Sequence, residues 1–192
     1  MKPLLFATSN NEKFAIAEHL CNLAGISLKQ LSEESDEILS EDPEIIIRDK
    51  AVRKFVLAGN RPIIVSDDTW EIPALNGFPG PYMKSVDHWF SPEQIIDLMA
   101  HVTDRRIYLH QYLAYQDDKV FKIFSSTTSG QVLKHPRGNY GKTGQKVITL
   151  DTDNGQSISE VYEHDYSAAA QRFSNEEGAW HDFIEWYKEY TA

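Results

Sequence analysis

The chain has 192 residues, which is enough for one domain or for two lobes that share one core. Its formal net charge of −10 argues against a protein that binds duplex nucleic acid or an anionic membrane through a broad surface, but it does not exclude a small phosphorylated ligand. No stretch resembles a signal peptide or approaches the roughly 20 apolar residues of a membrane helix, and the one cysteine, Cys21, excludes an internal disulfide. We therefore expect a cytoplasmic protein.

The first predicted elements are a strand and a helix with a polar turn between them. Residues 4–8 form a short apolar run, and residues 9–11, Ser-Asn-Asn, are typical of a helix cap. The spacing of the following apolar residues predicts a helix with Cys21 on its buried side. Polar groups at this helix start could bind an anion, to which Lys13 would add a positive charge. Most such turns are only helix caps, so both interpretations stay open.

The next elements lead to a pair of adjacent acids. A second strand is predicted at residues 26–31 and a helix at residues 45–57, with an acidic loop between them. Residues 62–65 then form a buried strand that ends before Asp67 and Asp68. Open α/β sheets bind ligands at the carboxyl ends of their strands, and two carboxylates suit a hard cation such as Mg²⁺ that bridges to phosphates. The alternative is an acidic turn without a ligand.

The second half of the chain begins with a stiff loop of glycines and prolines at residues 77–81, and a helix starts at Ser91-Pro92. We then expect antiparallel strands at 107–115, 120–128 and 131–133, a glycine-rich basic loop at 135–144, a strand at 147–150, a polar turn at 151–156, and helices at 168–173 and 176–190. Together with the strand–helix–strand start, this order predicts an α/β protein.

Three segments resemble the inosine triphosphate pyrophosphatase family, the Ham1-like nucleotidases. They read FATSNNEK near the start, VSDDTWEIPALNGFPGPYMK in the middle, and TSGQVLKHPRG before the glycine-rich loop. Their order and intervals match over nearly the whole chain. The resemblance implies an α/β fold with a mixed central sheet flanked by helices, elongated and two-lobed, and a homodimer. It makes residues 1–192 one Ham1-like domain, with one lobe from about 1–80 and 140–192 and the other from about 81–139.

The resemblance also implies an activity. This is hydrolysis of noncanonical purine nucleoside triphosphates, such as ITP, dITP or XTP, to the monophosphate and pyrophosphate, with Mg²⁺ or alternatively Mn²⁺. Asp68 would serve the metal and the attacking water, with Asp67 beside it. Glu37 matches the metal glutamate, with Glu41 as the alternative because one residue is inserted there. The residues implied to bind the substrate are Thr8, Ser9, Asn10, Lys13, Lys50, Lys84, Tyr140, Gly141, Gln171 and Arg172.

This chemistry is sensible without the resemblance. A triphosphate carries several negative charges, so cations and preorganised N–H donors must neutralise it as the transition state forms. A carboxylate within reach of a water can align that water and accept its proton. No Ser/His or Cys/His pairing points to a covalent nucleophile.

Several positions depart from the family pattern. Ser9 replaces a glycine of the phosphate loop, and the interval after Asp68 is one residue short, which leaves the assignment between Asp67 and Asp68 open. Residues 140–144 replace the family's Phe-Gly-Trp-Asp-Pro, and residues 170–172 replace its Ser-His-Arg. Because a site that reads a base through hydrogen bonds depends on those groups, the preferred base is expected to change.

Three hypotheses follow from these departures. The first is the noncanonical purine pyrophosphatase. The second is the same chemistry on a modified base, a pyrimidine or a dedicated dNTP, which Lys142 and Gln171 could read. The third is a nucleotide-binding protein that has lost turnover.

Overall fold

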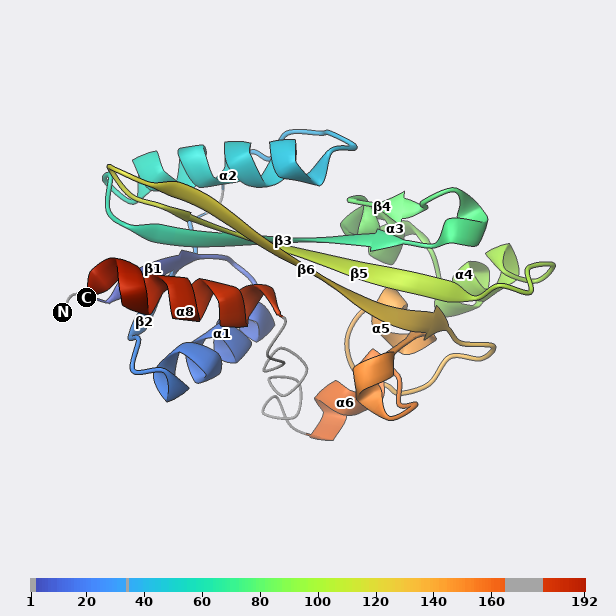
Figure 1. Cartoon of the computed structure of the whole chain (residues 1–192). Coiled ribbons are helices and arrows are strands. Elements are labelled where there is room, and N and C mark those ends of the chain that lie inside the picture. The colour runs from blue at the N-terminus through green and yellow to red at the C-terminus, as the bar shows by residue number, and fades with distance from the viewer. Residues whose placement is uncertain (1–2, 34, 165–177) are drawn as a thin grey trace. The chain divides into compact units, whose positions relative to one another are not determined.

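The computed structural model describes residues 3–33, 35–164 and 178–192 (Figure 1). The strand–helix–strand–helix–strand start is confirmed by β1 (Leu4–Ala7), α1 (Asn11–Leu23), β2 (Leu28–Leu31), α2 (Pro43–Leu57) and β3 (Ile63–Glu71). β1 pairs in parallel with both β2 and β3. The sequence-based prediction of a mixed α/β fold is therefore correct at its start, where the site residues begin.

The later strands make the sheet mixed. The hairpin strands β5 (Arg106–Gln116) and β6 (Phe121–Val132) and the short strand β7 (Ile148–Leu150) follow in the chain. Among the described residues the strand order is β2-β1-β3-β5-β6-β7, with β4 (Pro79–Gly80) paired to β3. β4 runs antiparallel to β3, and β7 runs antiparallel to β6. The predicted mixed sheet flanked by helices is confirmed.

The remaining helices are short except for the last. They are η1 (Pro73–Leu75), α3 (Met83–Trp89), α4 (Pro92–Leu98), α5 (Thr143–Val147), η2 (Asp151–Asp153), α6 (Ile158–His164) and α8 (Ala179–Thr191). α4 and α8 are predicted elements, and Ser91 caps α4 in a capping box with Gln94. The predicted helix at residues 168–173 lies outside the described residues. Among these residues no helix has the length and apolar character that a membrane crossing requires.

The predicted end of β3 is wrong. The acidic pair does not follow the end of β3, because this strand continues through Asp67 and Asp68 to Glu71. Trp70 and Glu71 pair with Gly80 and Pro79 of β4, so the ladder that this pairing supplies extends the strand. Successive side chains of a strand point to opposite faces. Asp67 and Asp68 therefore face opposite sides of the sheet.

The chain divides into two compact units. The first contains residues 1–67, 111–126 and 173–192, and the second contains residues 68–110 and 127–172. The predicted lobes, about 1–80 with 140–192 and about 81–139, rest on the resemblance and stay a prediction.

The first unit has helices on both sides of its strands (Figure 1). On one side, Ile63 and Val65 of β3 pack with Ile47 and Ala51 of α2. On the other side, α1 contacts α8, and Phe6 of β1 meets Trp180 edge-on at 5.5 Å between ring centroids. Trp180 is buried.

The thiol of Cys21 also belongs to this core. It is completely buried in α1, and burial raises its pKa to about 12. A thiol with this pKa is protonated at neutral pH and is a poor nucleophile. The prediction that Cys21 lies on the buried side of its helix is confirmed.

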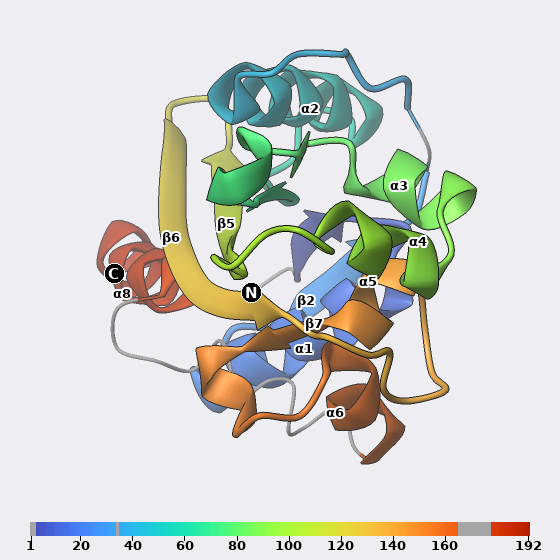
Figure 2. The ribbon, with the colours of Figure 1, turned by 90° about the vertical axis from the view of Figure 1, so that its right-hand side faces the viewer.

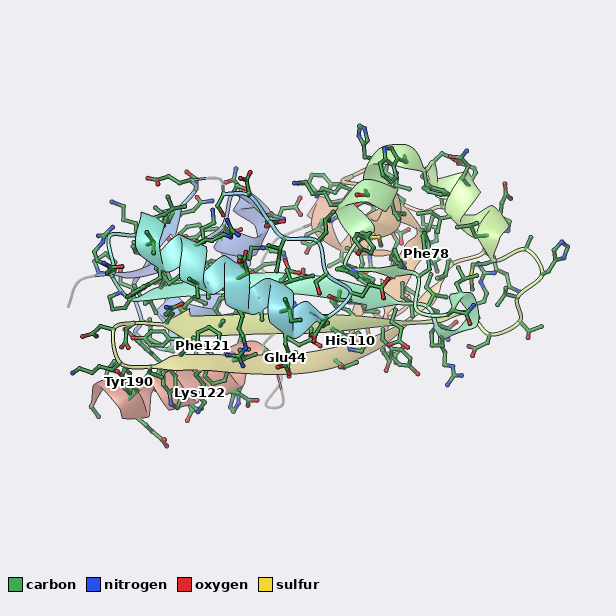
Figure 3. All side chains as sticks on the ribbon, turned by 90° about the horizontal axis from the view of Figure 1, so that it is seen from above. Glu44, Phe78, His110, Phe121, Lys122 and Tyr190 are labelled. Atoms are coloured by element: carbon green, nitrogen blue, oxygen red, sulfur yellow. The ribbon has the colours of Figure 1, made fainter. Side chains whose placement is uncertain are left out.

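The second unit has its own apolar core. Its buried side chains come from the short helices and from β5, β6 and β7; they include Val86, Ile95, Met99, Ile107, Leu109, Val147 and Ile158. α5 and α6 lie beside β7 (Figure 2). On the sheet, the His110 ring connects neighbouring strands (Figure 3), because its Nε2 lies 3.0 Å from Glu71 Oε2 and its Nδ1 lies 2.9 Å from Thr127 Oγ1.

The hairpin between β5 and β6 anchors the final helix. Asp117 Oδ2 accepts hydrogen bonds from the hydroxyls of Tyr115 (2.9 Å) and of Tyr190 (2.8 Å), a residue of α8 that Figure 3 labels. Burial acts to raise the pKa of Asp117, but the N–H groups of Lys119 and Val120 and the two tyrosine hydroxyls lower it below its usual value. The ionised carboxylate is thus the form that the fold stabilises.

We predict that Asp117→Ala lowers the free energy of unfolding by about 1 to 2 kcal/mol at pH 7, since several hydrogen bonds to one charged group are lost. A carboxyl whose pKa is depressed by folding stabilises the fold above its unfolded pKa of about 4, and the benefit disappears as pH falls through the folded value. The difference from the wild type should therefore shrink below about pH 4 in denaturant titrations. Asp118→Ala, the same charge change in the same turn, should stay close to wild type; an equal loss in that variant would contradict the assignment.

Candidate active site

The turn between β1 and α1 is built by its own side chains. Asn10 caps α1, because its Oδ1 accepts the N–H groups of Glu12 (2.9 Å) and Lys13 (3.1 Å). Thr8 Oγ1 accepts the N–H of Asn10 at 3.1 Å. The predicted cap is confirmed, and it holds Thr8, Ser9, Asn10 and Lys13 within one turn at the positive end of a 13-residue helix.

A residue that sequence reasoning missed braces this turn from β2. Gln30 Nε2 donates to the carbonyl oxygen of Thr8 at 3.1 Å and to Asn11 Oδ1 at 3.2 Å. A glutamine at the end of a short strand carries no signal for such a contact. The contact exists because β2 pairs with β1 in parallel register, so that Gln30 lies opposite Phe6.

A largely buried lysine joins two acids in the same unit. Lys50 Nζ lies 2.9 Å from Asp67 Oδ1 and 3.0 Å from Glu37 Oε1. Asp67 faces α2 because it alternates with Ile63 and Val65, which pack on that helix. The side chains of Lys50 and Asp67 are only 14% and 18% exposed, whereas that of Glu37 is 52% exposed.

The charge state of this cluster follows from its geometry. Burial alone would lower the pKa of Lys50, but the charges of Asp67 and Glu37 and their hydrogen bonds raise it above its usual value. Lys50 is therefore protonated at neutral pH and compensates both carboxylates.

The acidic segment before α2 is tied to that helix. The ammonium of Lys54, a buried side chain, donates to the carbonyl oxygen of Glu33. Glu37 is the acid of this segment that reaches Lys50, and Glu41, the alternative named from the sequence, is exposed. The segment is thus not a wholly solvated loop.

The donor set can be compared with the needs of Mg²⁺. Within the described ranges, no group of three or more His, Cys, Asp or Glu side chains is placed to hold a metal ion. Mg²⁺ does not require such a group, because it commonly binds one or two carboxylates together with phosphate oxygens and water. Glu37 and Asp67, each with an oxygen within 3.0 Å of one nitrogen, fit a cation of this kind that arrives with its phosphates.

The other predicted residues belong to the second unit or lie outside the description. Asp68 is half-buried on the opposite face of β3 from Asp67, and Lys84 is exposed on α3. Gln171 and Arg172 lie outside the described residues. Their predicted roles stay predictions.

The predicted base-facing loop is ordered by local contacts. The ring of Tyr140 is half-buried and lies 6.2 Å from that of Tyr162. Gly141 has φ of +75°, a left-handed backbone conformation that strains residues with a Cβ and therefore favours glycine. Gly141 therefore has a structural reason to be glycine, beside any contact with a substrate.

Comparison with known proteins decides the family. A family model described as the Ham1 family matches residues 4–179. This chain belongs to the Ham1 family. A dITP/XTP pyrophosphatase of Saccharolobus solfataricus is 29% identical over 184 residues, which cover 96% of this chain and 93% of that protein. A dITP/XTP pyrophosphatase of Hyperthermus butylicus is 25% identical over 187 residues, which cover 97% of this chain and 95% of that protein.

Solved Ham1 structures have the same fold. A Ham1 protein from Coxiella burnetii superposes with a TM-score of 0.75 at 19% identity, over 98% of this chain and 100% of that one. The Staphylococcus aureus Ham1 protein gives a TM-score of 0.70 at 18% identity, over 97% and 99% of the two chains. The sequence-based resemblance to this family is confirmed.

We predict that Lys50→Met lowers the free energy of unfolding by about 2 to 3 kcal/mol at pH 7, because it leaves a largely buried carboxylate without its counter-charge. The added substitution Asp67→Asn should recover part of this loss, and denaturant titrations of the single and double variants measure the coupling. The matched control is Arg53→Met. It removes a cation of the same helix whose ion pair with Asp49 is exposed, so we expect a change within about 0.5 kcal/mol. Equal losses in the two single variants would show that Lys50 has no special role.

Proposed function

We propose that this protein is a nucleoside triphosphate pyrophosphatase that acts on noncanonical purine nucleotides such as ITP, dITP or XTP. The proposal rests on one observation. The first unit contains both a capped helix start and the Lys50–Asp67–Glu37 cluster. Family membership and relatives named dITP/XTP pyrophosphatase support it.

The helix start and the cluster lie at the same end of the sheet. β1 pairs with β3 so that Leu5 is opposite Ile63 and Phe6 is opposite Ile64. Continued by one residue, this register puts Ala7 beside Val65, roughly 7 Å along the strand from Asp67. A phosphate bound at the start of α1 would thus lie near both carboxylates and Lys50.

Each group of the turn has a role toward the triphosphate. The amino end of α1 attracts negative charge, and the side chains of Thr8 and Asn10 orient the backbone there. Lys13 adds a positive charge one turn into the helix. Lys50 holds Glu37 and Asp67 in place, and both carboxylates would bind Mg²⁺. When bound, Mg²⁺ neutralises phosphate charge and orients the reacting group.

The reaction adds water across the bond between the α- and β-phosphates. A water oxygen bonds to phosphorus, the bond to the departing phosphate oxygen breaks, and a carboxylate takes the water proton. The carboxylate of Asp67 is held by Lys50 at 2.9 Å. Asp67, which faces Lys50 and Glu37, is assigned to the cation; the role of Asp68 as the acceptor, on the opposite face of β3, stays a prediction.

The same chemistry on another or a modified nucleotide is the second candidate. It is favoured by the exposed Lys142 in a loop that lacks the tryptophan and aspartate of the resembled family pattern. The homodimer, the cytoplasmic location and the use of Mg²⁺ or Mn²⁺ stay predictions.

We predict pyrophosphate release with Mg²⁺ from ITP, dITP or XTP, at least tenfold faster than from ATP or GTP at equal concentration. Asp68→Asn should abolish release while nucleotide binding, measured by calorimetry, persists. A panel that also contains pyrimidine and modified dNTPs separates the two candidates by the preferred base. If the protein binds nucleotides but releases pyrophosphate from none of them, it is a nucleotide-binding protein that has lost turnover.

We also predict that Asn10→Asp raises KM for the triphosphate at least tenfold with little change in stability. Aspartate caps a helix as well as asparagine does, but its charge would repel a phosphate at this end of α1. The reverse exchange at the cap of α2, Asp42→Asn, is the matched control and should leave KM unchanged. If Asn10→Asp keeps the wild-type KM, phosphate does not bind at this turn.

A further inference from the structure

The loop from Gly138 to Gly144, here called the 138–144 loop, is held in place by side chains of α6. It crosses from the end of the basic segment after β6 to the start of α5, and all of it belongs to the second unit. α6 ends at His164, and Gln171 and Arg172 follow it in the sequence.

Glu163 makes the central contact. Its Oε1 accepts the N–H groups of two successive loop residues, Asn139 and Tyr140, the latter at 3.0 Å. Hydrogen bonds from backbone N–H groups to a carboxylate are stronger than hydrogen bonds between neutral groups. They fix the peptide planes on both sides of Asn139, and hence the direction in which Tyr140 leaves the backbone.

Ser159, one turn earlier in α6, holds the next peptide. Its hydroxyl donates to the carbonyl oxygen of Tyr140 at 2.6 Å. Gly138 lies so close that a Cβ there would be 2.4 Å from Ser159 Oγ. The N–H and C=O of Tyr140 are thus both bonded to α6 side chains, four residues apart on that helix.

The far end of the loop is held by a different helix. Asp87 of α3 accepts the N–H of Gly144 at 2.7 Å, and Thr143 Oγ1 donates to the carbonyl oxygen of Phe90 at 2.9 Å. Because α3 holds this end of the loop, the hydrogen bonds from α6 at the other end determine the positions of Tyr140 and Lys142.

We propose that Glu163 is a positioning residue that sets the conformation of the 138–144 loop and thereby decides which nucleobase is accepted. This inference rests on the proposed function. Glu163 acts through Tyr140 and its neighbours and need not touch the substrate. None of the loop contacts described above involves the proposed phosphate-binding residues Thr8, Lys13 and Lys50, so we expect the effect on base preference rather than on the phosphate chemistry.

The test compares Glu163→Ala with Glu163→Gln, Ser159→Ala and the control Asp151→Ala. Glutamine keeps an oxygen that can accept both N–H groups, whereas alanine removes it. Asp151 is an exposed acid of the same unit, so its removal matches the charge change of Glu163→Ala. Amide hydrogen exchange at Asn139 and Tyr140 reports the loop, and kcat/KM for ITP, XTP, GTP and ATP reports the preference.

We expect Glu163→Ala to speed exchange of these two amides at least tenfold and to change the ITP-to-ATP ratio of kcat/KM at least fivefold, with kcat for the best nucleotide within threefold of wild type. Glu163→Gln should keep the amide exchange and the kcat/KM ratio close to those of the wild type. Ser159→Ala should shift the ratio in the same direction as Glu163→Ala, and Asp151→Ala should change neither the exchange nor the ratio. Unchanged exchange, or faster exchange with an unchanged ratio, would overturn the proposal.

The outcome also separates this inference from the proposed function. A wild type that releases no pyrophosphate contradicts the proposed function, and amide exchange and nucleotide dissociation constants then decide the role of Glu163 without turnover. A wild type that is active, with Glu163→Ala showing wild-type exchange and preference, contradicts only the inference made here.

Discussion

The ammonium group of Lys50 is the interaction on which the arrangement of the first unit depends. A largely buried carboxylate such as Asp67 repels a second carboxylate beside it unless a cation compensates both. Lys50 supplies that cation from α2, which brings the acidic segment with Glu37 to Asp67 of β3. The same contact that stabilises the fold keeps two oxygen donors close together before any nucleotide arrives.

Much of the fold could be predicted from local signals. Apolar runs marked the strands. Asn10 and Ser91 marked the helix starts, because a helix cap depends on only a few adjacent residues. α3 and α6 were missed because each has only seven residues, too few for a clear periodic pattern, and Tyr82 at the start of α3 offers no side-chain cap. The end of β3 was misplaced because its continuation depends on pairing with β4, a strand that comes later in the chain.

The candidate site divides in the same way. The turn at residues 8–13 is local and was predicted from sequence. The resemblance named Lys50 and Glu37 for phosphate and metal, but it did not foresee that they contact each other, since that contact spans 13 residues of chain and needs α2 to be folded. Gln30, Ser159 and Glu163 act on the backbone of other segments, and residues that bond to a backbone carry no signal in their own sequence neighbourhood.

Because neighbours in β3 face opposite sides, the strand tolerates changes of residue far better than changes of length. A substitution at Asp67 alters one face only, whereas one residue inserted before it would exchange the two faces for everything up to the pairing with β4. Turns can absorb such insertions, and the chain turns at Asn60 before β3 and at Asn76 after it, both at positive φ. Over evolutionary time, deletions and insertions in this part of the protein should therefore occur at those two turns, while the number of residues in β3 stays constant.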